Sequence, residues 1–392
     1  MQLKSHLEHF TACIREGRQP LGVFLGAGCP KSISESADGA DPLIPDTKGM
    51  TLSVRDRVIG QGYQDTWEVV LDQVKPGGMD LEEVNIEEIL SQVRGLSQYS
   101  REDSEGSLQK ENLAALEHEI CEEIVDLVDV NLPDGPSGYL DLATWLGSID
   151  RQEPVEIFTT NYDLLLEEAL EKRRIPYFDG FVGGYRPFFD RHTVTNDELP
   201  TQWVRLWKLH GSMNWVSQEQ DGSRRIWRTD DISGERAVIH PSHMKYDQSR
   251  KMPYLTLIDR LKQFLDRDES VLFIVGYSFG DEHINDVLIQ ALRESPTATV
   301  FAFMYGELDQ YHEAQQIAKA QSNFCLFARD KGIIGTNEAI WSTKEDTSEK
   351  EDGMIGVEWE ETGDGKRNEQ FVLGNFEKFG ELFRSVTGSD IL

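Results

Sequence analysis

Residues 21–28 read Leu-Gly-Val-Phe-Leu-Gly-Ala-Gly, a mostly apolar run that ends in two glycines around an alanine. A continuous apolar run of this length, bounded by glycine, is typical of a strand that is buried on both faces. The glycines after it allow the backbone to turn tightly. This stretch therefore predicts a buried strand, Leu21 to Leu25, followed at once by a turn at Gly26, Ala27 and Gly28.

Five further runs of the same kind follow, and helical patterns separate several of them. Asp281 after the run ending at Val275 has the side chain of an N-cap for the next helix. Strands that alternate with helices predict an α/β fold with a doubly wound (Rossmann-like), mostly parallel sheet. The five runs are Val155–Thr160, Trp203–Leu209, Val271–Val275, Thr299–Met304 and Phe324–Ala328.

A long segment with helical periodicity separates the first two strands. Apolar residues recur at helical spacing in Asn85–Leu96 and in Leu113–Val130. Because this segment lies inside a single crossover between two strands, we expect a helical insertion at about residues 50–150 that covers the sheet edge. A separately folding domain is the weaker alternative.

The last sixty residues differ in character from the rest. Residues 342–371 contain ten acidic and four basic residues. The sequence predicts one α/β domain at 1–330 and a small acidic C-terminal extension at 331–392. Met354–Trp359 and Gln370–Leu373 fit short strands, and Phe376–Val386 fits a closing helix. A solvated, irregular appendage and an assembly surface are both open interpretations of this extension.

Charge and cysteine content exclude several classes of protein. The net charge of −31 repels phosphate backbones, so no direct nucleic-acid partner is expected. No stretch approaches the roughly 20 apolar residues of a membrane span, and the first 20 residues lack the apolar core of a secretory signal. These features predict a cytoplasmic protein. Its four cysteines are too far apart to form a CxxC zinc half-site, so reduced thiols and no metal are expected.

Four polar or glycine-rich loops each follow directly after a predicted strand. They are Gly26-Ala27-Gly28, Thr160-Asn161-Tyr162-Asp163, His210-Gly211, and the run from Gly276 through Tyr277 and Ser278 to Gly280. In an open parallel sheet, ligands bind outside the carboxyl ends of the strands, where the strand order reverses. The four loops are therefore expected to converge on one ligand site.

Each loop also has a simpler structural interpretation. Paired glycines in a turn can serve packing alone, and Asn161 or Asp163 can merely cap the next helix. A lone histidine such as His210 is more often structural than catalytic, although Gly211 beside it would keep one ring face accessible. Gly276–Gly280 offers a backbone nest and the Ser278 hydroxyl, which suit a ribose or phosphate.

Taken in order with Ile44-Pro45-Asp46, these loops resemble the motifs of the sirtuin superfamily over residues 22–305. The pattern is most similar to the sirtuin-like NADases of bacterial anti-phage defence. The resemblance implies NAD⁺ as substrate, with its pyrophosphate on the glycine-rich turn and with Asn161 and His210 at the reacting ribose. It also implies Asp163 on the nicotinamide amide and Ser278 near the adenosine ribose or phosphate. The implied NAD-binding set is Gly26, Ala27, Gly28, Asp46, Thr160, Asp163, Gly276, Tyr277 and Ser278.

The sequence also departs from the sirtuin pattern. It lacks the paired CxxC motifs of the zinc ribbon in deacylating sirtuins, and Thr47-Lys48 stands where the family usually has Phe-Arg. Tyr162 replaces the usual Ile. These changes weigh against an acyl-lysine peptide channel and leave NAD⁺ glycosidic chemistry in place.

The resemblance therefore predicts hydrolysis of NAD⁺ to nicotinamide and ADP-ribose. Asn161 would orient a water or a ribose hydroxyl, and His210 would accept its proton with a near-neutral pKa. The alternatives are an NAD-dependent protein deacylase or ADP-ribosyltransferase, and a non-catalytic NAD or ADP-ribose sensor. The sequence has no cluster of metal ligands at the spacing that would indicate a nuclease, and His240–His243 fits a polar loop. The resemblance further implies a homo-oligomer and a HerA-like hexameric ATPase as partner.

Overall fold

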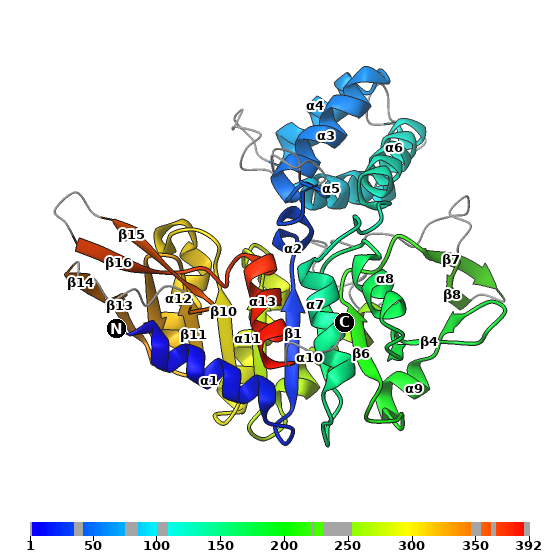
Figure 1. Ribbon diagram of the computed structural model, residues 1–392. Coiled ribbons are helices and arrows are strands. Elements are labelled where there is room, and N and C mark those ends of the chain that lie inside the picture. Colours follow the sequence, from blue (N-terminus) through cyan, green and yellow to red (C-terminus); the bar gives the residue numbers. More distant parts are fainter. Residues whose placement is uncertain are drawn as a thin grey trace.

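A nine-stranded sheet forms the centre of the molecule in the computed structural model, which describes residues 2–34, 42–74, 85–99, 109–220, 223–229, 253–345, 354–361 and 366–387 (Figure 1). All six predicted strands belong to this sheet, which confirms the α/β fold. They are β1 (Leu21–Leu25), β2 (Glu156–Thr159), β6 (Val204–Lys208), β9 (Val271–Val275), β10 (Thr299–Phe303) and β11 (Phe324–Phe327).

The strand order is β13-β12-β11-β10-β9-β1-β2-β6-β3, with β1 near the middle. From β1 the chain builds one side of the sheet through β2, β6 and the short β3 (Tyr177–Phe178), and it later builds the other side through β9, β10 and β11. These seven strands pair in parallel. The order reverses at β1, so the loops after β1, β2, β6 and β9 meet at one edge of the sheet.

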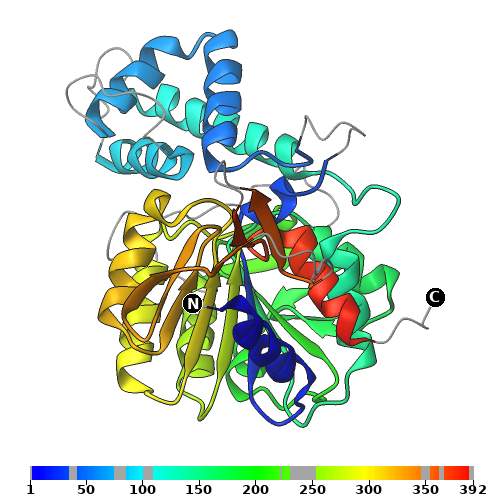
Figure 2. The same ribbon diagram turned by 60° about the vertical axis from the view of Figure 1, so that its left-hand side comes forward.

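Successive residues of the strands face two different hydrophobic cores. In β1, Val23 packs in one core and Phe24 in the other, and both side chains are fully buried. Helices cover both faces, so the sheet is the middle of three layers (Figure 2). The helices are α1 (Leu3–Arg15), α7 (Gly138–Ser148), α8 (Leu165–Lys172) and α13 (Phe376–Val386) on the first face, and α10 (Tyr254–Leu265), α11 (Glu282–Glu294) and α12 (His312–Ala320) on the second.

A helical lobe stands over the carboxyl edge of the sheet, beyond the short helix α2 (Gly28–Lys31), as Figures 1 and 2 show. The expected insertion at about residues 50–150 comprises this lobe and α7, which returns to the sheet. The four helices of the lobe are α3 (Thr47–Gly60), α4 (Gln64–Val74), α5 (Ile86–Tyr99) and α6 (Lys110–Val128).

The residues after 330 pack against the rest of the molecule. β12 (Lys331–Ile334) and β13 (Asn337–Ile340) extend the main sheet antiparallel to β11, so the expected boundary at 330 falls between two paired strands. α13 coincides with the expected closing helix, and Phe379 on it is fully buried. The short strands β14 (Thr343–Glu345), β15 (Val357–Glu361) and β16 (Lys366–Phe371) form a separate sheet.

A second small sheet flanks β6 and has no counterpart in the sequence prediction. Its order is β4-β5-β8-β7, and two of its strands have only two residues. Between β5 and β6 lies α9 (Arg191–Asn196). No helix within the described ranges is long and apolar enough to cross a membrane. The strands are β4 (Phe181–Val182), β5 (Phe188–Phe189), β7 (Trp215–Gln220) and β8 (Ser223–Arg228).

Candidate functional site

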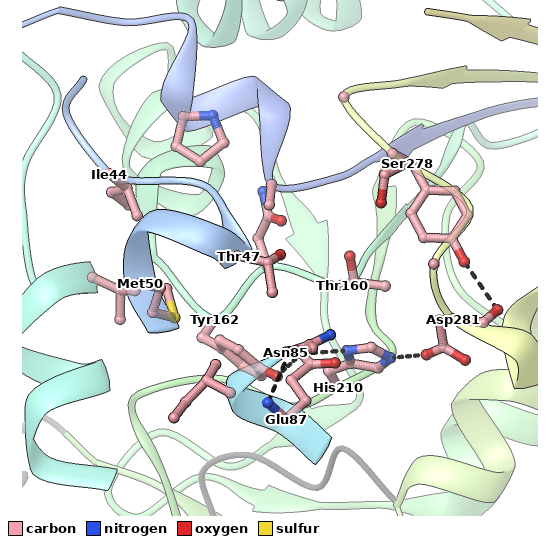
Figure 3. A pocket seen from close by; sticks show the side chains of 18 of the residues that line it. Ile44, Thr47, Met50, Asn85, Glu87, Thr160, Tyr162, His210, Ser278 and Asp281 are labelled. Atoms are coloured by element: carbon pink, nitrogen blue, oxygen red, sulfur yellow. Dashed lines mark hydrogen bonds and ion pairs between the residues drawn. The ribbon is translucent and has the colours of Figure 1, made fainter. Parts of the chain in front are cut away.

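A pocket lies where the loops after β1, β2, β6 and β9 meet, beneath the helical lobe (Figure 3). Its empty volume is about 990 Å³, open solvent at the mouth included. The sheet loops contribute Ala27, Thr160, Asn161, Tyr162, Asp163, His210, Gly276, Tyr277, Ser278, Gly280, Asp281 and His283. The segment from Pro30 to the lobe contributes Pro30, Ile44, Pro45, Thr47, Met50, Asn85, Ile86, Glu87 and Val128.

The glycine-rich turn after β1 packs directly on the turn after β9. The Gly28 amide donates to the Gly276 carbonyl at 2.8 Å, and a Cβ on Gly26 would lie 2.3 Å from that same oxygen. Gly276 has φ +69°, which also favours glycine. Of these turn residues, Ala27 and Gly276 line the pocket, whereas Gly26 and Gly28 lie behind it and permit the close approach of the two turns.

The start of α2 is already hydrogen-bonded. α2 has four residues, and besides the Gly28 amide the Cys29 amide donates to the Gly26 carbonyl at 3.0 Å. These two amides are therefore already bonded within the protein and are not free to bind a phosphate. A bound pyrophosphate would have to find its donors elsewhere on the two turns.

Asn161 is fixed between the ends of β1 and β2. The Thr159 hydroxyl donates to the Leu25 carbonyl at 2.8 Å and accepts a hydrogen bond from the Asn161 amide at 3.0 Å. The Asn161 side chain donates from Nδ2 to the Gly26 carbonyl at 3.1 Å. Thr159 thus holds the Asn161 backbone and the turn after β1 holds its side chain, and Thr160 lines the pocket beside it.

Asp163 both caps a helix and lines the pocket. Its Oδ1 accepts a hydrogen bond from the Leu165 amide at 3.0 Å, at the start of α8. Its side chain is buried, and burial raises its pKa to about 6, although the nearby Lys208 ammonium opposes that rise. The two interpretations of this residue from the sequence are therefore compatible.

His210 lies at the end of β6 with both ring nitrogens facing carboxylates. Nε2 is 2.9 Å from Asp281 Oδ2, and Nδ1 is 3.6 Å from Glu87 Oε1. The ring is buried, and Gly211 after it has φ +94°, a backbone conformation that favours glycine. Gly211 therefore serves the turn, and the expectation that it keeps a face of the His210 ring accessible is not met.

The charge of His210 follows from these neighbours. Burial disfavours the charged ring, but the carboxylates of Asp281 and Glu87 outweigh it and raise the His210 pKa to about 10. Burial raises the pKa of the Asp281 carboxyl, but the His210 ring outweighs this effect and lowers that pKa to about 2. The near-neutral pKa expected for His210 is therefore wrong in this arrangement, in which the ring is an imidazolium at pH 7.

Three other predicted residues occupy different places. The Ser278 side chain is exposed and, in Figure 3, lies on the same side of the pocket as Thr160. The Tyr277 hydroxyl donates to Asn285 Oδ1 at 3.2 Å and is buried, so only the rest of its side chain is left for the pocket. Asp46 does not line the pocket. It caps α3 by accepting a hydrogen bond from the Gly49 amide, and it pairs with Lys31.

Two acidic residues of the site were not identified from the sequence. Asp281 is the predicted N-cap of α11, where Oδ1 accepts from the His283 and Ile284 amides, and its other oxygen faces His210. A polar residue soon after the Gly276 turn was the available signal for that role. Glu87 comes from α5 of the helical lobe, and no local pattern distinguishes it from Glu88.

Metal-binding residues do not gather within the described part of the chain. No group of three or more His, Cys, Asp or Glu there could hold a metal ion, and the four cysteines are free thiols. His240–His243, for which the sequence predicts a polar loop, lies outside the described residues.

Residues 155–325 match the profile of the SIR2-like domain. The match covers somewhat less than half of the chain. The matched range spans the loops that hold Asn161, His210 and Ser278, and it ends in β11. The turn after β1 precedes the range, but it packs on the Gly276 turn inside it.

Among solved structures, the chain is similar to one described under the words "Structural Basis for the Mechanism and Regulation of Sir2 Enzymes", with 11% identity and a TM-score of 0.34. That similarity covers 77% of this chain and 85% of the other. No curated protein matches the chain in sequence.

Proposed function

We propose that this protein is an NAD⁺ glycohydrolase that cleaves the nicotinamide–ribose bond to give nicotinamide and ADP-ribose. The observation that carries the proposal is that Asn161 and His210, from the ends of two adjacent strands, line one pocket in a SIR2-like domain. That pocket lies at the switch point of the sheet, where α/β folds bind nucleotides.

The residues of the pocket suit the two ends of NAD⁺. The carboxylates of Glu87 and Asp281 contact His210, and Asp163 also lines the pocket. These carboxylates favour a cationic nicotinamide and the positive charge that develops on the ribose. On the other side, Ala27, Gly276 and Ser278 offer backbone and a hydroxyl to phosphate and ribose oxygens. The chain's residues therefore fit a ligand with a cationic and an anionic end.

The reaction assigns a task to each of three side chains. The ribose C1′–nitrogen bond breaks with its electron pair going to the nicotinamide ring, and a water oxygen forms the new bond to C1′. Asn161 orients that water or a ribose hydroxyl, since its amide can both donate and accept. His210 takes the released proton, and Asp163 holds the nicotinamide carboxamide.

The first test is NAD⁺ consumption by the purified protein beside Asn161→Ala and His210→Ala. We expect NAD⁺ loss by the wild type and at least a hundredfold less by either variant, the usual contribution of such groups. His192→Ala and Asn196→Ala on the exposed helix α9 are matched controls that should retain activity. Full turnover by Asn161→Ala would refute the assignment.

One observation favours a second candidate, a site that binds NAD or ADP-ribose without turnover. In the described arrangement His210 is held by carboxylates on both sides and is an imidazolium. Calorimetric binding of NAD⁺ with no product under any condition would support this sensor. Product formation that depends on an acyl-lysine or acceptor peptide would instead indicate a deacylase or ADP-ribosyltransferase.

We also propose that the activity serves anti-phage defence in the cytoplasm and is gated by assembly, because unregulated NAD⁺ hydrolysis would exhaust the host cell. The proposal extends to a homo-oligomer and to a HerA-like hexameric ATPase as partner. Light scattering of the purified chain tests the first. NAD⁺ consumption with and without the ATPase tests the second, and equal rates would refute gating by that partner.

A further inference from the structure

The helical lobe delivers one carboxylate to the pocket from a fixed position. Two side chains hold the start of α5: Asn85 Oδ1 accepts a hydrogen bond from the Glu87 amide at 2.8 Å, and Thr51 Oγ1 accepts one from the Ile86 amide at 2.9 Å. Thr51 belongs to α3, so two helices of the lobe are tied at this point. The backbone of Glu87 is therefore held in place at the start of α5.

The Glu87 carboxylate lies between Tyr162 and His210. The Tyr162 hydroxyl donates to Glu87 Oε1 at 2.7 Å, and the same oxygen is 3.6 Å from His210 Nδ1 (Figure 3). His210 Nδ1 is buried and has no hydrogen-bond partner within 3.5 Å among the residues that the structure describes. Tyr162 stands where the sirtuin pattern has Ile, and Glu87 comes from the insertion, so both halves of this contact are departures from that pattern.

Several elements bring charged and titratable groups to the pocket around His210. Glu87 comes from α5, Asp281 from the N-cap of α11, and Tyr162 and Asp163 from the loop after β2. Tyr254 of α10 lies beside Gly211, and Tyr277 after β9 and His283 of α11 also line the pocket. The described pocket lining includes no lysine or arginine, so the His210 ring is the nearest counter-charge for Glu87 and Asp281.

These contacts decide which ring nitrogen can accept a proton. With Asp281 on Nε2, a neutral His210 would donate from Nε2 and keep its lone pair on Nδ1. The Glu87 carboxylate faces that lone pair and favours a second proton, on Nδ1, in addition to the proton on Nε2. A ring that carries protons on both nitrogens cannot act as a base.

We propose that Glu87 is a positioning residue through which the helical lobe holds His210, so that the ring becomes free to accept a proton only when α5 withdraws. Asp281 orients the His210 ring both when α5 is in place and when it is withdrawn. Glu87 contacts the ring only when α5 is in place. This proposal deepens the proposed hydrolase by naming its internal brake, and it rests on that function only for its effect on rate.

The deciding measurement is an NMR titration of the His210 ring with ¹³C-labelled histidine in the wild type, Glu87→Gln and Glu88→Gln. Glutamine keeps an oxygen for Tyr162 but removes the charge. We expect the His210 pKa to fall by at least one unit in Glu87→Gln and to stay unchanged in Glu88→Gln, since Glu88 does not line the pocket. An unchanged titration in Glu87→Gln would overturn the proposal.

The pH profile of NAD⁺ cleavage gives the second readout. The acid limb should move to lower pH in Glu87→Gln, and the rate at pH 7 should rise about tenfold for each unit by which the His210 pKa falls. Tyr162→Phe, which removes the other contact of Glu87, should shift the profile in the same direction by less. A Glu87→Gln rate below that of the wild type at every pH would show that Glu87 promotes the reaction and would overturn the brake.

The two readouts separate this inference from the proposed function. The titration requires no turnover, so a shifted His210 pKa with no NAD⁺ cleavage by any variant would refute the hydrolase and support the hold of Glu87 on His210. Cleavage that requires His210, with an unchanged titration in Glu87→Gln, would support the hydrolase and refute the hold.

Discussion

The His210–Asp281 pair links the site to the stability of the fold. The pKa of His210, about 10, exceeds the ordinary value of 6.5. The stabilisation that His210 contributes to the fold is therefore complete below pH 6.5 and is lost as the pH rises through 10. The pKa of Asp281, about 2 against 3.8, gives a contribution that is present above pH 3.8 and is lost as the pH falls through 2. The pair therefore stabilises the folded chain most between these ordinary values.

Asp281→Asn tests that window. Asparagine still caps α11, but it removes the charge at His210 Nε2, so we expect the free energy of unfolding to fall by about 2 kcal/mol near pH 5. The deficit should shrink as the pH rises towards 10, as measured by urea unfolding. Asp190→Asn, at the N-cap of α9, is the matched control and should show a flat difference above pH 6.5. A flat difference for Asp281→Asn would contradict the pairing.

The Asp163 carboxyl has the opposite effect on stability from the His210–Asp281 pair. Because burial raises its pKa to about 6, the carboxyl destabilises the folded state as the pH rises from 3.8 through 6. Asp163→Asn keeps an oxygen for the Leu165 amide and should raise the free energy of unfolding at pH 7 by about 1 to 2 kcal/mol. That gain in stability should vanish below pH 4. The variant should also cleave NAD⁺ more slowly than the wild type. Lower stability at pH 7 would show that the ionised carboxylate is needed for the fold.

Residues that directly follow a strand could be placed from the sequence, and residues brought in by another element could not. Asn161 and His210 were found because parallel strands end at one edge of the sheet, which fixes where the next residues lie. Glu87 reaches the same pocket through the packing of the helical lobe. That packing depends on contacts such as Thr51 to Ile86, which leave no periodic signal in the sequence.

At the scale of elements, the start of α5 is the joint between the lobe and the site. Thr51→Val removes the acceptor of the Ile86 amide, so we expect a loss of stability of about 1 kcal/mol, as for a missing helix cap. Hydrogen exchange at Ile86 and Glu87 should quicken first. Thr144→Val is the control, because its hydroxyl donates within α7 to the Leu140 carbonyl. Unchanged exchange at Ile86 would contradict this role of Thr51.

Long apolar runs and helical periodicity were sufficient to predict the main elements. All six predicted strands are present because strands buried on both faces must be apolar throughout. The β4-β5-β8-β7 sheet was not predicted, since two-residue strands such as Phe181–Val182 carry no alternation to detect. β12 and β13 were missed for the same reason, because four residues between turns resemble any loop.

At the scale of the whole molecule, the sheet and the C-terminal residues share one core. Phe379 of α13 contacts Phe273 of β9 and Phe303 of β10, with ring centroids 6.1 and 5.6 Å apart. Phe383 packs on Trp145 of α7, at 4.5 Å. The strand that carries the Gly276 turn therefore packs against a helix more than a hundred residues later in the chain.

Phe379→Ala tests whether the residues after 330 form an extension or a part of the core. A fully buried phenylalanine removed from a packed core should cost about 3 to 4 kcal/mol, and because its neighbours lie in the central strands, the whole molecule should unfold at lower denaturant. Tyr185→Ala, at a fully exposed aromatic residue, should change stability by less than about 0.5 kcal/mol. Fluorescence and circular dichroism should follow one shifted transition. An early transition of the C-terminal residues alone, with the main transition unchanged, would show that they fold as a separate extension.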